Sequence, residues 1–566
     1  MKTWDAVPKI VQLNEELDVT PLTPAWFLDG SHSTPPFTPM YSWFWAHPSA
    51  GGIGAGMQWV ADKITMPWHK GCLFKMIGGS DYLSPSIIKD EEEVKMREAK
   101  FKEALRPYIE DFNGLWAGYR DELLEKYKPL KEANLDAMSN VELKEQFRLI
   151  TEAHRRMWEI HWLMLYVAAT CWGVFQDTCF SMFGIDQESP QFQDATRGFD
   201  NKAFQMDRRQ WEFAQDVKKR GLTDIFTGPA SGVIPKLEQS KAGKEWLKEF
   251  NEFLQEDGWR AGRECEINGP TWIEDPTMPI ENIQNFLKLK KEGFQLDAMR
   301  SELQRKRQEA QEALLKKVPV EERDFFKVMM NVAGQTGAFS EEHGYYCEYY
   351  INALIRRICL AIGKRFVKAG ALDHVDDIMF LNGDEVNFCS PSPEFHDVRS
   401  IVKFRKKEWE ESCKEERKRP ISIGKLGPQE GMGYLMSAKD STIIDIAIGR
   451  MPKPKPELKA DLYGIPVSAG VVEGPARCVS DFRELAEVQP GEILVCPAAQ
   501  PSWTSVFSLL KGVVSAHGGT LHHASVIARE YGIPAVSNVF DGIGRIKTGQ
   551  RIRVDGTQGV VYFLDK

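Results

Sequence analysis

A short stretch near the C-terminus constrains this 566-residue chain more than any other part of it. From Gly518 to Ala528 it reads GGTLHHASVIA, and it follows the apolar segment 512–516. This pattern predicts a strand, a glycine turn and a helix with paired histidines in its first turn. The N-terminus of a helix offers free N–H groups and a positive dipole end, which favour phosphate. Neutral imidazole is nucleophilic near pH 7, since its ordinary pKa is about 6.5. The pattern therefore predicts a phosphohistidine site.

The motif continues as REYGIPAV to Val536, where Gly532 and Pro534 favour the end of the helix. The whole stretch resembles the phosphohistidine, or mobile, domain of phosphoenolpyruvate-utilising enzymes, a family that includes phosphoenolpyruvate synthase, pyruvate phosphate dikinase and rifampin phosphotransferase. The resemblance covers residues 461–566. It aligns the phosphorylated histidine of the family with His523, because the letters that follow this residue fix the register. A phosphorylated His522 and a purely structural His523 are the alternatives.

The resemblance also implies which residues support the phosphoryl group. They are the turn, the second histidine and an arginine two turns into the helix: Gly518, Gly519, Thr520, His522 and Arg529. For Arg529 we expect this support to act through the fold or the docking of the domain, without direct contact to phosphate. Leu521 stands where the pyruvate-linked members commonly have Thr, as it does in the antibiotic-phosphorylating relatives. This departure favours an acceptor other than pyruvate.

Composition excludes several classes of partner. The chain has 72 basic and 81 acidic residues, a net charge of −9 and no basic tract, so neither nucleic acid nor an anionic membrane is expected to bind it. Its ten cysteines form no CxxC pair, so no metal site or disulfide framework is predicted. The first residues lack the apolar core of a signal peptide, and the uncharged run 160–176 is shorter than the roughly 20 residues of a spanning helix. We expect a cytoplasmic protein in which this run is a buried helix.

The pattern of the chain predicts a multidomain protein with a large, mainly α-helical N-terminal domain (1–450) and a C-terminal α/β swivelling phosphohistidine domain (461–566). Residues 1–85 are rich in Pro, Gly and Trp and are expected to be irregular. Amphipathic spacing predicts helices over 90–127, from the capping box at 139–142 onward, and over 279–315, 321–333, 341–369 and 400–419. Short β segments are predicted at 476–480, 492–496, 513–516, 551–555 and 560–564.

The stretch 451–460 alternates proline and lysine and is the clearest linker in the chain. Such a composition favours an extended, solvated conformation, and ten residues at about 3.1 Å each reach roughly 30 Å. A tether of this length predicts that the phosphohistidine domain swings between two distant sites.

Sparser stretches in the first 450 residues resemble the acceptor-binding domain of the same phosphotransferases, and over nearly its whole length the chain is similar to the large subunit of phenylphosphate synthases. This resemblance implies a phenol-type acceptor. A phenol is only about 0.1% ionised at pH 7, so a base is expected beside it. We predict His343 as this catalytic base, with a buried or surface structural role as the alternative. Expected acceptor-binding residues are His32, Trp259, Arg260, Glu342, Tyr346 and Arg356. His154 and His161 lie seven apart on one helix face, which fits core packing better than a ligand pair.

No nucleotide-grasp pattern, Walker motif or pyruvate barrel accompanies these domains in the sequence. We therefore expect no cofactor to be tightly bound in this chain, with ATP and Mg²⁺ supplied through a separate ATP-grasp-type subunit. The resemblance implies a dikinase-type reaction in which His523 receives the β-phosphoryl group of ATP and passes it to a small aromatic hydroxyl. A component of a split phosphoenolpyruvate synthase or dikinase and a non-catalytic phosphocarrier remain as alternatives.

Overall fold

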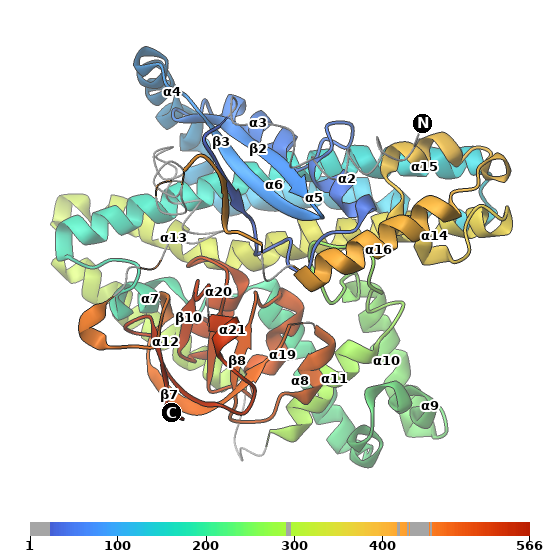
Figure 1. Ribbon diagram of the computed structural model, residues 1–566. Coiled ribbons are helices and arrows are strands. Elements are labelled where there is room, and N and C mark those ends of the chain that lie inside the picture. Colours follow the sequence, from blue (N-terminus) through green and yellow to red (C-terminus); the bar gives the residue numbers. More distant parts are fainter. Residues whose placement is uncertain are drawn as a thin grey trace. The chain divides into compact units, whose positions relative to one another are not determined.

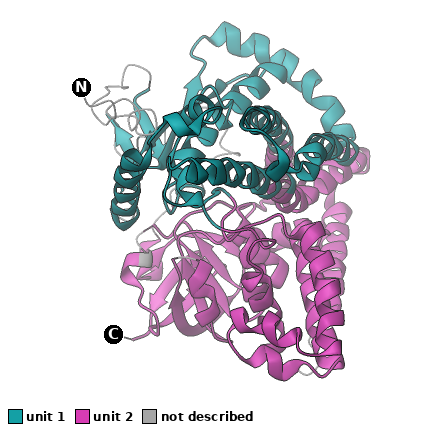
Figure 2. Cartoon of the chain, turned by 90° about the vertical axis from the view of Figure 1, so that its right-hand side faces the viewer, with its two compact units in different colours: residues 1–167, 265–269, 346–441 teal, residues 168–264, 270–345, 442–566 magenta. Residues whose placement is uncertain are grey.

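A computed structural model describes residues 23–289, 296–415, 419–426, 430, 452, 455–480, 482–540 and 542–565. The chain separates into two compact units (Figure 2). Unit 1 comprises residues 1–167, 265–269 and 346–441, and unit 2 comprises residues 168–264, 270–345 and 442–566. Unit 2 thus combines part of the helical region with the whole C-terminal block. The predicted domain division at 451–460 stays a prediction.

Unit 1 contains an antiparallel sheet, and because three of its strands lie in the first 90 residues, the prediction of an irregular 1–85 is wrong for the described part (Figure 1). Its strand order is β2-β3-β1-β4, with bounds His69–Ile77, Ser80–Ile87, Ala25–Leu28 and Ser422–Gly424. Two helices accompany the sheet, α2 (Pro39–Ala46) and α3 (Ile53–Lys63). Several glycines and prolines of this region lie at turns and helix starts. Gly78 and Gly79 turn β2 into β3 with φ angles of 53° and 78°, and Pro39 begins α2, where no N–H is needed.

Long helices make up most of the remainder of unit 1. They are α4 (Glu91–Glu110), α5 (Phe112–Glu132), α6 (Asn140–Phe183), α14 (Tyr350–Lys368), α15 (Gly383–Cys389) and α16 (Arg399–Glu415). Helix α6 contributes its last 16 residues, 168–183, to unit 2.

Local side-chain chemistry sets where these helices begin. The single helix predicted over 90–127 is two, because Asp111 caps α5 by accepting from the Gly114 amide at 3.0 Å. The predicted capping box is confirmed: the Ser139 amide donates to the Glu142 carboxylate at 2.7 Å, and the Glu142 amide donates to the Ser139 hydroxyl at 3.3 Å. The uncharged run lies inside α6 and is mostly buried. Among the described residues, no helix is long and apolar enough to cross a membrane.

The helical part of unit 2 holds α7 (Pro190–Thr196), α8 (Lys202–Lys219), α9 (Val233–Leu237), α10 (Lys241–Asp257), α11 (Thr277–Lys288), α12 (Leu296–Lys317) and α13 (Arg323–His343). The helix predicted over 279–315 therefore corresponds to α11 and α12, with 290–295 outside the described residues. The helix predicted over 341–369 begins at the end of α13, continues as a π-helical turn (Gly344–Tyr349) and then becomes α14. Such π turns are often found at functional sites.

The C-terminal block of unit 2 is a mixed eight-stranded sheet with order β5-β12-β11-β7-β8-β9-β10-β6, accompanied by α19 (Thr504–Phe507), α20 (His523–Tyr531) and α21 (Gly542–Arg545) (Figure 1). In chain order the strands are β5 (Leu462–Tyr463), β6 (Ile465–Ser468), β7 (Val471–Cys478), β8 (Ile493–Cys496), β9 (Gly512–Ser515), β10 (Ala535–Ser537), β11 (Arg551–Asp555) and β12 (Val560–Phe563). The five predicted β segments are confirmed. Strands β7 to β10 are parallel neighbours, and α20 follows the carboxyl end of β9, the edge where α/β sheets bind ligands.

The described part of the linker is not extended throughout. Residues Pro456–Leu458 form a 3₁₀ turn, and Lys459 follows with a φ of 48°. The Tyr562 hydroxyl donates to the Leu458 carbonyl at 3.2 Å. The expected extended conformation is therefore wrong at 456–458, where the chain folds against β12. Residues 451, 453 and 454 lie outside the described residues.

One apolar core joins the helical part of unit 2 to its C-terminal block. It is formed by buried side chains of α8, α10 and α11 together with those of β8, α19 and α20, including Trp246, Phe250, Ile283, Phe507 and Ile527. The block is thereby held against the helices with α20 facing them. This packing positions the histidine-bearing end of α20.

Candidate active site

The turn before α20 requires glycine. Gly518 has a φ of 116°, and a Cβ atom at this position would lie 2.7 Å from Cγ of His522. His522 caps the helix with an extended backbone, and its carbonyl accepts from the amides of Ser525 and Val526 at 2.9 and 3.0 Å. Gly532 ends the helix in the left-handed conformation, with a φ of 64°, as the sequence predicts. His523 is consequently the first residue of α20 and follows the glycine turn closely.

His523 lies between two buried carboxylates. Its Nδ1 is 3.0 Å from Oε1 of Glu341, and its Nε2 is 3.0 Å from Oε2 of Glu264. The imidazole is 8% exposed, and the two glutamates are 3% and 2% exposed. Burial by itself would lower the pKa of His523, but the charges of Glu264 and Glu341 outweigh it and hold this pKa well above its ordinary value. In this arrangement the ring is an imidazolium with a proton on each nitrogen.

The two glutamates come from different kinds of structure. Glu341 belongs to the last turn of α13, and the neighbouring Ser340 hydroxyl donates to the Leu521 carbonyl at 3.1 Å. Helix α13 is thereby attached to the turn that carries His523. Glu264 lies in the irregular segment between α10 and α11, and its amide donates to Oε1 of Gln500 at 3.4 Å.

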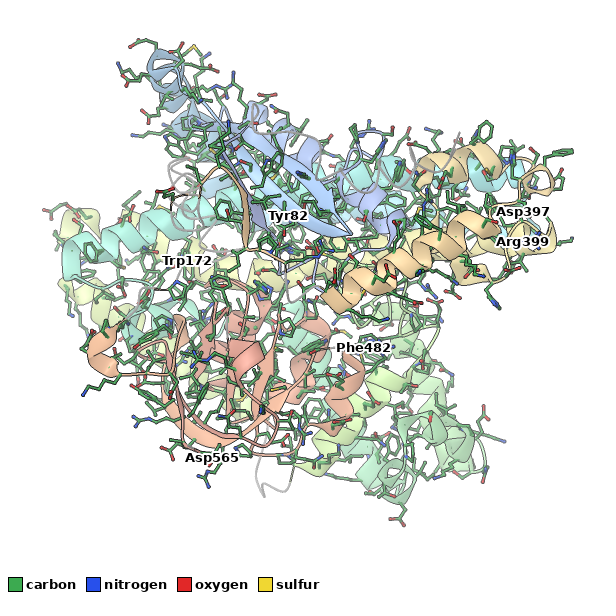
Figure 3. All side chains as sticks on the ribbon, viewed as in Figure 1. Tyr82, Trp172, Asp397, Arg399, Phe482 and Asp565 are labelled. Atoms are coloured by element: carbon green, nitrogen blue, oxygen red, sulfur yellow. The ribbon has the colours of Figure 1, made fainter. Side chains whose placement is uncertain are left out.

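Contacts from the C-terminal block also hold the segment of Glu264. The Ser502 hydroxyl donates to the Gly262 carbonyl at 3.1 Å. The ring of Phe482, labelled in Figure 3, packs against Gly262 so closely that a Cβ atom there would lie 2.5 Å from it. These contacts tie the carboxylate-bearing segment to the same block that presents His523.

Gly344 makes the close approach possible. A Cβ atom on this residue would lie 2.4 Å from Oε1 of Glu264 and 3.3 Å from Cε1 of His523. Any larger side chain would therefore displace the carboxylate. Gly344 opens the π-helical turn that follows α13, which brings the backbone against the imidazole.

A cationic cluster adjoins this turn at Tyr345. Cζ of Arg260 and Nζ of Lys202 each lie 4.8 Å from the centre of the Tyr345 ring, and Arg260 also lies 5.2 Å from the Trp272 ring. Arg260 is buried, and it precedes Glu264 by one short stretch of chain. Trp259, the next predicted acceptor residue, donates from its indole to the carbonyl of the preceding helix α10 at Gln255, 3.0 Å away. Arg260 therefore contacts the Tyr345 ring, whereas the indole N–H of Trp259 is bonded to helix α10.

His343 is buried near the end of α13. Its Nδ1 is 2.9 Å from the Phe339 carbonyl, and its ring stacks on the Phe339 ring with centroids 4.9 Å apart. Because a carbonyl only accepts, Nδ1 carries a hydrogen, and the lone pair of the neutral ring is on Nε2. Glu342 is half-buried beside it. The predicted roles of both residues stay predictions.

Three predicted acceptor residues belong to unit 1. Nδ1 of His32 is 2.7 Å from Oδ2 of the buried Asp29, and the Arg356 guanidinium donates to Oδ1 of Asp376 at 3.0 Å. Tyr346 is half-buried. Each lies in an ordered environment of unit 1, and their predicted role in acceptor binding is untested.

The predicted phosphate-supporting residues differ in surroundings. Thr520 and His522 are buried in the turn, and the Gly519 carbonyl accepts from the Ser525 hydroxyl at 2.8 Å. Arg529 instead donates to the Val467 carbonyl of β6 at 3.0 Å, and burial lowers the pKa of its guanidinium to about 10. Arg529 therefore joins α20 to the sheet in this structure. Neither Glu264 nor Glu341 is among the site residues predicted from the sequence.

A glycine-bounded histidine that begins a helix at the carboxyl edge of parallel strands is the arrangement that the sequence motif predicts for a phosphohistidine domain. Comparisons with known proteins agree with this class. The family model for the PEP-utilising enzyme mobile domain matches residues 488–559, and the model for the rifampicin phosphotransferase fourth domain matches residues 164–341. The chain thus carries the mobile domain of the PEP-utilising enzymes, and its relatives include the rifampicin phosphotransferases, as the sequence motif predicts.

Three relatives illustrate the range of similarity. The uncharacterised phosphotransferase YvkC of Bacillus subtilis is 28% identical over 388 residues, which are 67% of this chain and 44% of that protein. Rifampicin phosphotransferase of Streptomyces sviceus is 30% identical over 342 residues, 58% of this chain and 36% of that protein. Phosphoenolpyruvate synthase of Aeropyrum pernix is 35% identical over 144 residues, 24% of this chain and 17% of that protein. The chain thus spans less than half the length of each relative.

Proposed function

We propose that this chain is a phosphotransferase component that carries a phosphoryl group on His523 and transfers it to the hydroxyl of a small, phenol-type acceptor. The observation that carries the proposal is the position of His523. It follows a glycine turn, begins α20, and points both ring nitrogens at carboxylates of the helical part of unit 2. A purely structural histidine has no need of two buried carboxylates.

An aromatic acceptor is supported by the residues next to this histidine and by the likeness to phenylphosphate synthases. Tyr345 and Trp272 offer ring faces beside Arg260, whose charge suits a transferred phosphate. His343 remains the proposed catalytic base of the acceptor pocket, as the sequence suggested. Catalysis of phosphoryl transfer at such a site is largely positioning and charge stabilisation.

For the donor half of the reaction, we propose that a separate ATP-grasp-type subunit binds ATP and Mg²⁺. The reaction is proposed to take place in the cytoplasm. The β-phosphoryl group of ATP would pass to His523, with AMP and phosphate released. After loading, the C-terminal block would return to the helical part of unit 2 and adopt the docking that its shared apolar core favours.

The test is mass analysis of the chain after incubation with its co-purified nucleotide-binding subunit and Mg-ATP. We expect one acid-labile phosphoryl adduct on the peptide that contains His523. The adduct should be absent from His523→Ala and unchanged in His374→Ala, which alters an exposed histidine of unit 1. An adduct that persists in His523→Ala would overturn the proposal.

The same protein can be used to test whether phosphoenolpyruvate, in place of ATP, is the phosphoryl donor. Incubation with radiolabelled phosphoenolpyruvate in the absence of ATP should leave His523 unlabelled. Label on His523 under these conditions would replace the phenol-type reaction with a split phosphoenolpyruvate synthase or dikinase. Saturable quenching of tryptophan fluorescence by phenol would in turn exclude a carrier that binds only proteins.

A further inference from the structure

The two ring nitrogens of His523 have different surroundings. Nδ1 meets Glu341, which is fixed on helix α13 next to the Ser340–Leu521 hydrogen bond. Nε2 meets Glu264, which lies in an irregular segment. A regular helix holds a side chain in a more constant direction than an irregular segment does. The difference suggests that the two carboxylates have different tasks.

We propose that Glu341 keeps a proton on Nδ1 of His523 so that the phosphoryl group is carried on Nε2, and that Glu264 accepts the proton of the attacking hydroxyl group. This assignment rests on the proposed function and deepens it, because it names a positioning carboxylate and a catalytic one. In this assignment Glu264 replaces His343 as the base that takes the acceptor proton, and His343 keeps its Nδ1 hydrogen bond to the Phe339 carbonyl.

The transfer step balances with these two carboxylates alone. Phosphohistidine begins with a proton on Nδ1, held by Glu341, and the phosphoryl group on Nε2. The acceptor oxygen forms its bond to phosphorus while the P–Nε2 bond breaks, and the bonding electron pair returns to Nε2. The hydroxyl proton passes to Glu264 and then to Nε2. The products are a phosphate ester and an imidazolium between two carboxylates.

The arrangement in the structure is that product state. Both ring nitrogens are 3.0 Å from a carboxylate oxygen, the arrangement expected for a ring with a hydrogen on each nitrogen between two charged carboxylates. Glu264 occupies the position next to Nε2 where the phosphoryl group would be attached, so its side chain must rotate when His523 is phosphorylated. Oε1 of Glu264 already packs closely on the backbone of Gly344, since a Cβ atom there would lie 2.4 Å from it, so the rotation must carry the carboxylate away from Gly344.

The experiment separates loading from transfer by using phosphoramidate, a small donor that phosphorylates imidazole without ATP or a partner. Phosphorus NMR of the loaded chain should show the phosphoryl group on Nε2. Transfer is then followed to phenol and to the more acidic 4-nitrophenol. Glu264→Gln should slow transfer to phenol by about 100-fold or more, but transfer to 4-nitrophenol by at most about tenfold, because a more acidic hydroxyl needs less help from a base.

Glu341→Gln should behave differently. Without its charge the proton on Nδ1 is held less tightly, so the leaving group becomes poorer. Transfer should slow by a similar factor for both acceptors, and its pH optimum should move to lower pH. Glu252→Gln, which removes an exposed carboxylate of α10, should match the wild type in every assay. A phosphoryl group on Nδ1, or equal acceptor dependence in the two variants, would overturn the assignment.

Gly344→Ala tests Glu264 without removing it. The new methyl group would meet Oε1 of Glu264 at 2.4 Å and push the carboxylate away. The rate of transfer to phenol should fall between those of the wild type and Glu264→Gln, with unchanged helix content by circular dichroism.

If the wild type loads His523 but never forms phenyl phosphate, the proposed acceptor is wrong. Hydrolysis then tests the assignment separately, with water as the attacking hydroxyl, and equal hydrolysis by wild type and Glu264→Gln would reject it.

Discussion

Two histidines of this chain are almost equally buried but have opposite pKa shifts. His154, on α6 in unit 1, is 1% exposed, and burial lowers its pKa to about 3. Its Nε2 accepts from the indole of Trp158 at 3.0 Å, and its ring meets Phe44 edge-on. His523 is 8% exposed, and its pKa is held well above the ordinary value. Burial therefore does not distinguish a functional histidine from a core histidine.

The partners make the difference. Among the described residues, aromatic rings surround His154, which supports the interpretation of this residue as core packing. His161 differs, because its Nδ1 lies 3.2 Å from Oε1 of the buried Glu348. At His523 two carboxylates replace the lost hydration of an imidazolium. The same carboxylates would repel a phosphoryl dianion, so the charge on His523 decides which contacts are favourable. A site of this kind is sensitive to phosphorylation in a way that the surroundings of His154 are not.

The largest effect is expected when the partners of His523 are neutralised. In the double variant Glu264→Gln, Glu341→Gln, burial becomes the dominant influence, so the pKa of His523 should drop below 6.5 and approach the behaviour of His154. Titration of the histidine ring protons by NMR measures both residues in one sample. His154 should be unchanged. A His523 ring that stays protonated at pH 8 in the double variant would contradict the electrostatic explanation.

A smaller effect is expected at His154. Its folded pKa of about 3 lies below the unfolded value of about 6.5, so acid protonates the unfolded chain first and destabilises the fold between pH 6.5 and 3. At pH 5 this amounts to about 2 kcal/mol. His154→Gln removes the titration and keeps an acceptor for Trp158. Urea unfolding at pH 7 and pH 5 should show a loss about 2 kcal/mol smaller in the variant than in the wild type. Equal losses would mean that His154 titrates normally.

Much of the site could be predicted from sequence because its parts are local. The turn at Gly518, the helix start at His523 and its end at Gly532 depend on neighbours within one stretch of chain. The capping box at Ser139 is local in the same sense. Short β segments of the sequence also located strands of the C-terminal block, because runs such as Ile493–Cys496 are apolar and buried over their whole length.

The carboxylates could not be predicted in the same way. Glu341 and Glu264 meet His523 across 182 and 259 residues (523 minus 341, and 523 minus 264), and no local rule pairs such positions. A weak signal existed for Glu341, which lies eleven residues, about three helical turns, after the buried Met330 and hence on the same face. The sheet of unit 1 was missed for another reason. The glycine and proline content of residues 1–85 was interpreted as a sign of irregular structure, but some of these residues, such as Gly78, form the turns between strands.

The smallest effect is expected at the C-terminal end of α20, where a buried carboxylate again meets a side chain of this helix. There the Tyr531 hydroxyl donates to the buried Asp207 carboxylate at 2.6 Å, so a neutral hydroxyl contacts this carboxylate where a charged ring contacts the carboxylates at the His523 end. Burial raises the pKa of Asp207 to about 7, while the hydrogen bond from Tyr531 opposes this shift. The folded state thus favours protonated Asp207, and its contribution to stability declines as pH rises from about 4 to 7.

Tyr531→Phe should cost about 2 kcal/mol at pH 8, where Asp207 is charged, and about 1 kcal/mol at pH 5.5, where it is neutral, because hydrogen bonds to charged groups are the stronger ones. Urea unfolding at the two pH values measures the difference. Phe540→Leu, which changes a ring of the C-terminal block away from Asp207, should show no such pH dependence. A cost for Tyr531→Phe that is the same at both pH values would mean that Asp207 is not titrating. The two ends of α20 would then differ only in geometry, and the charge contrast between them would be lost.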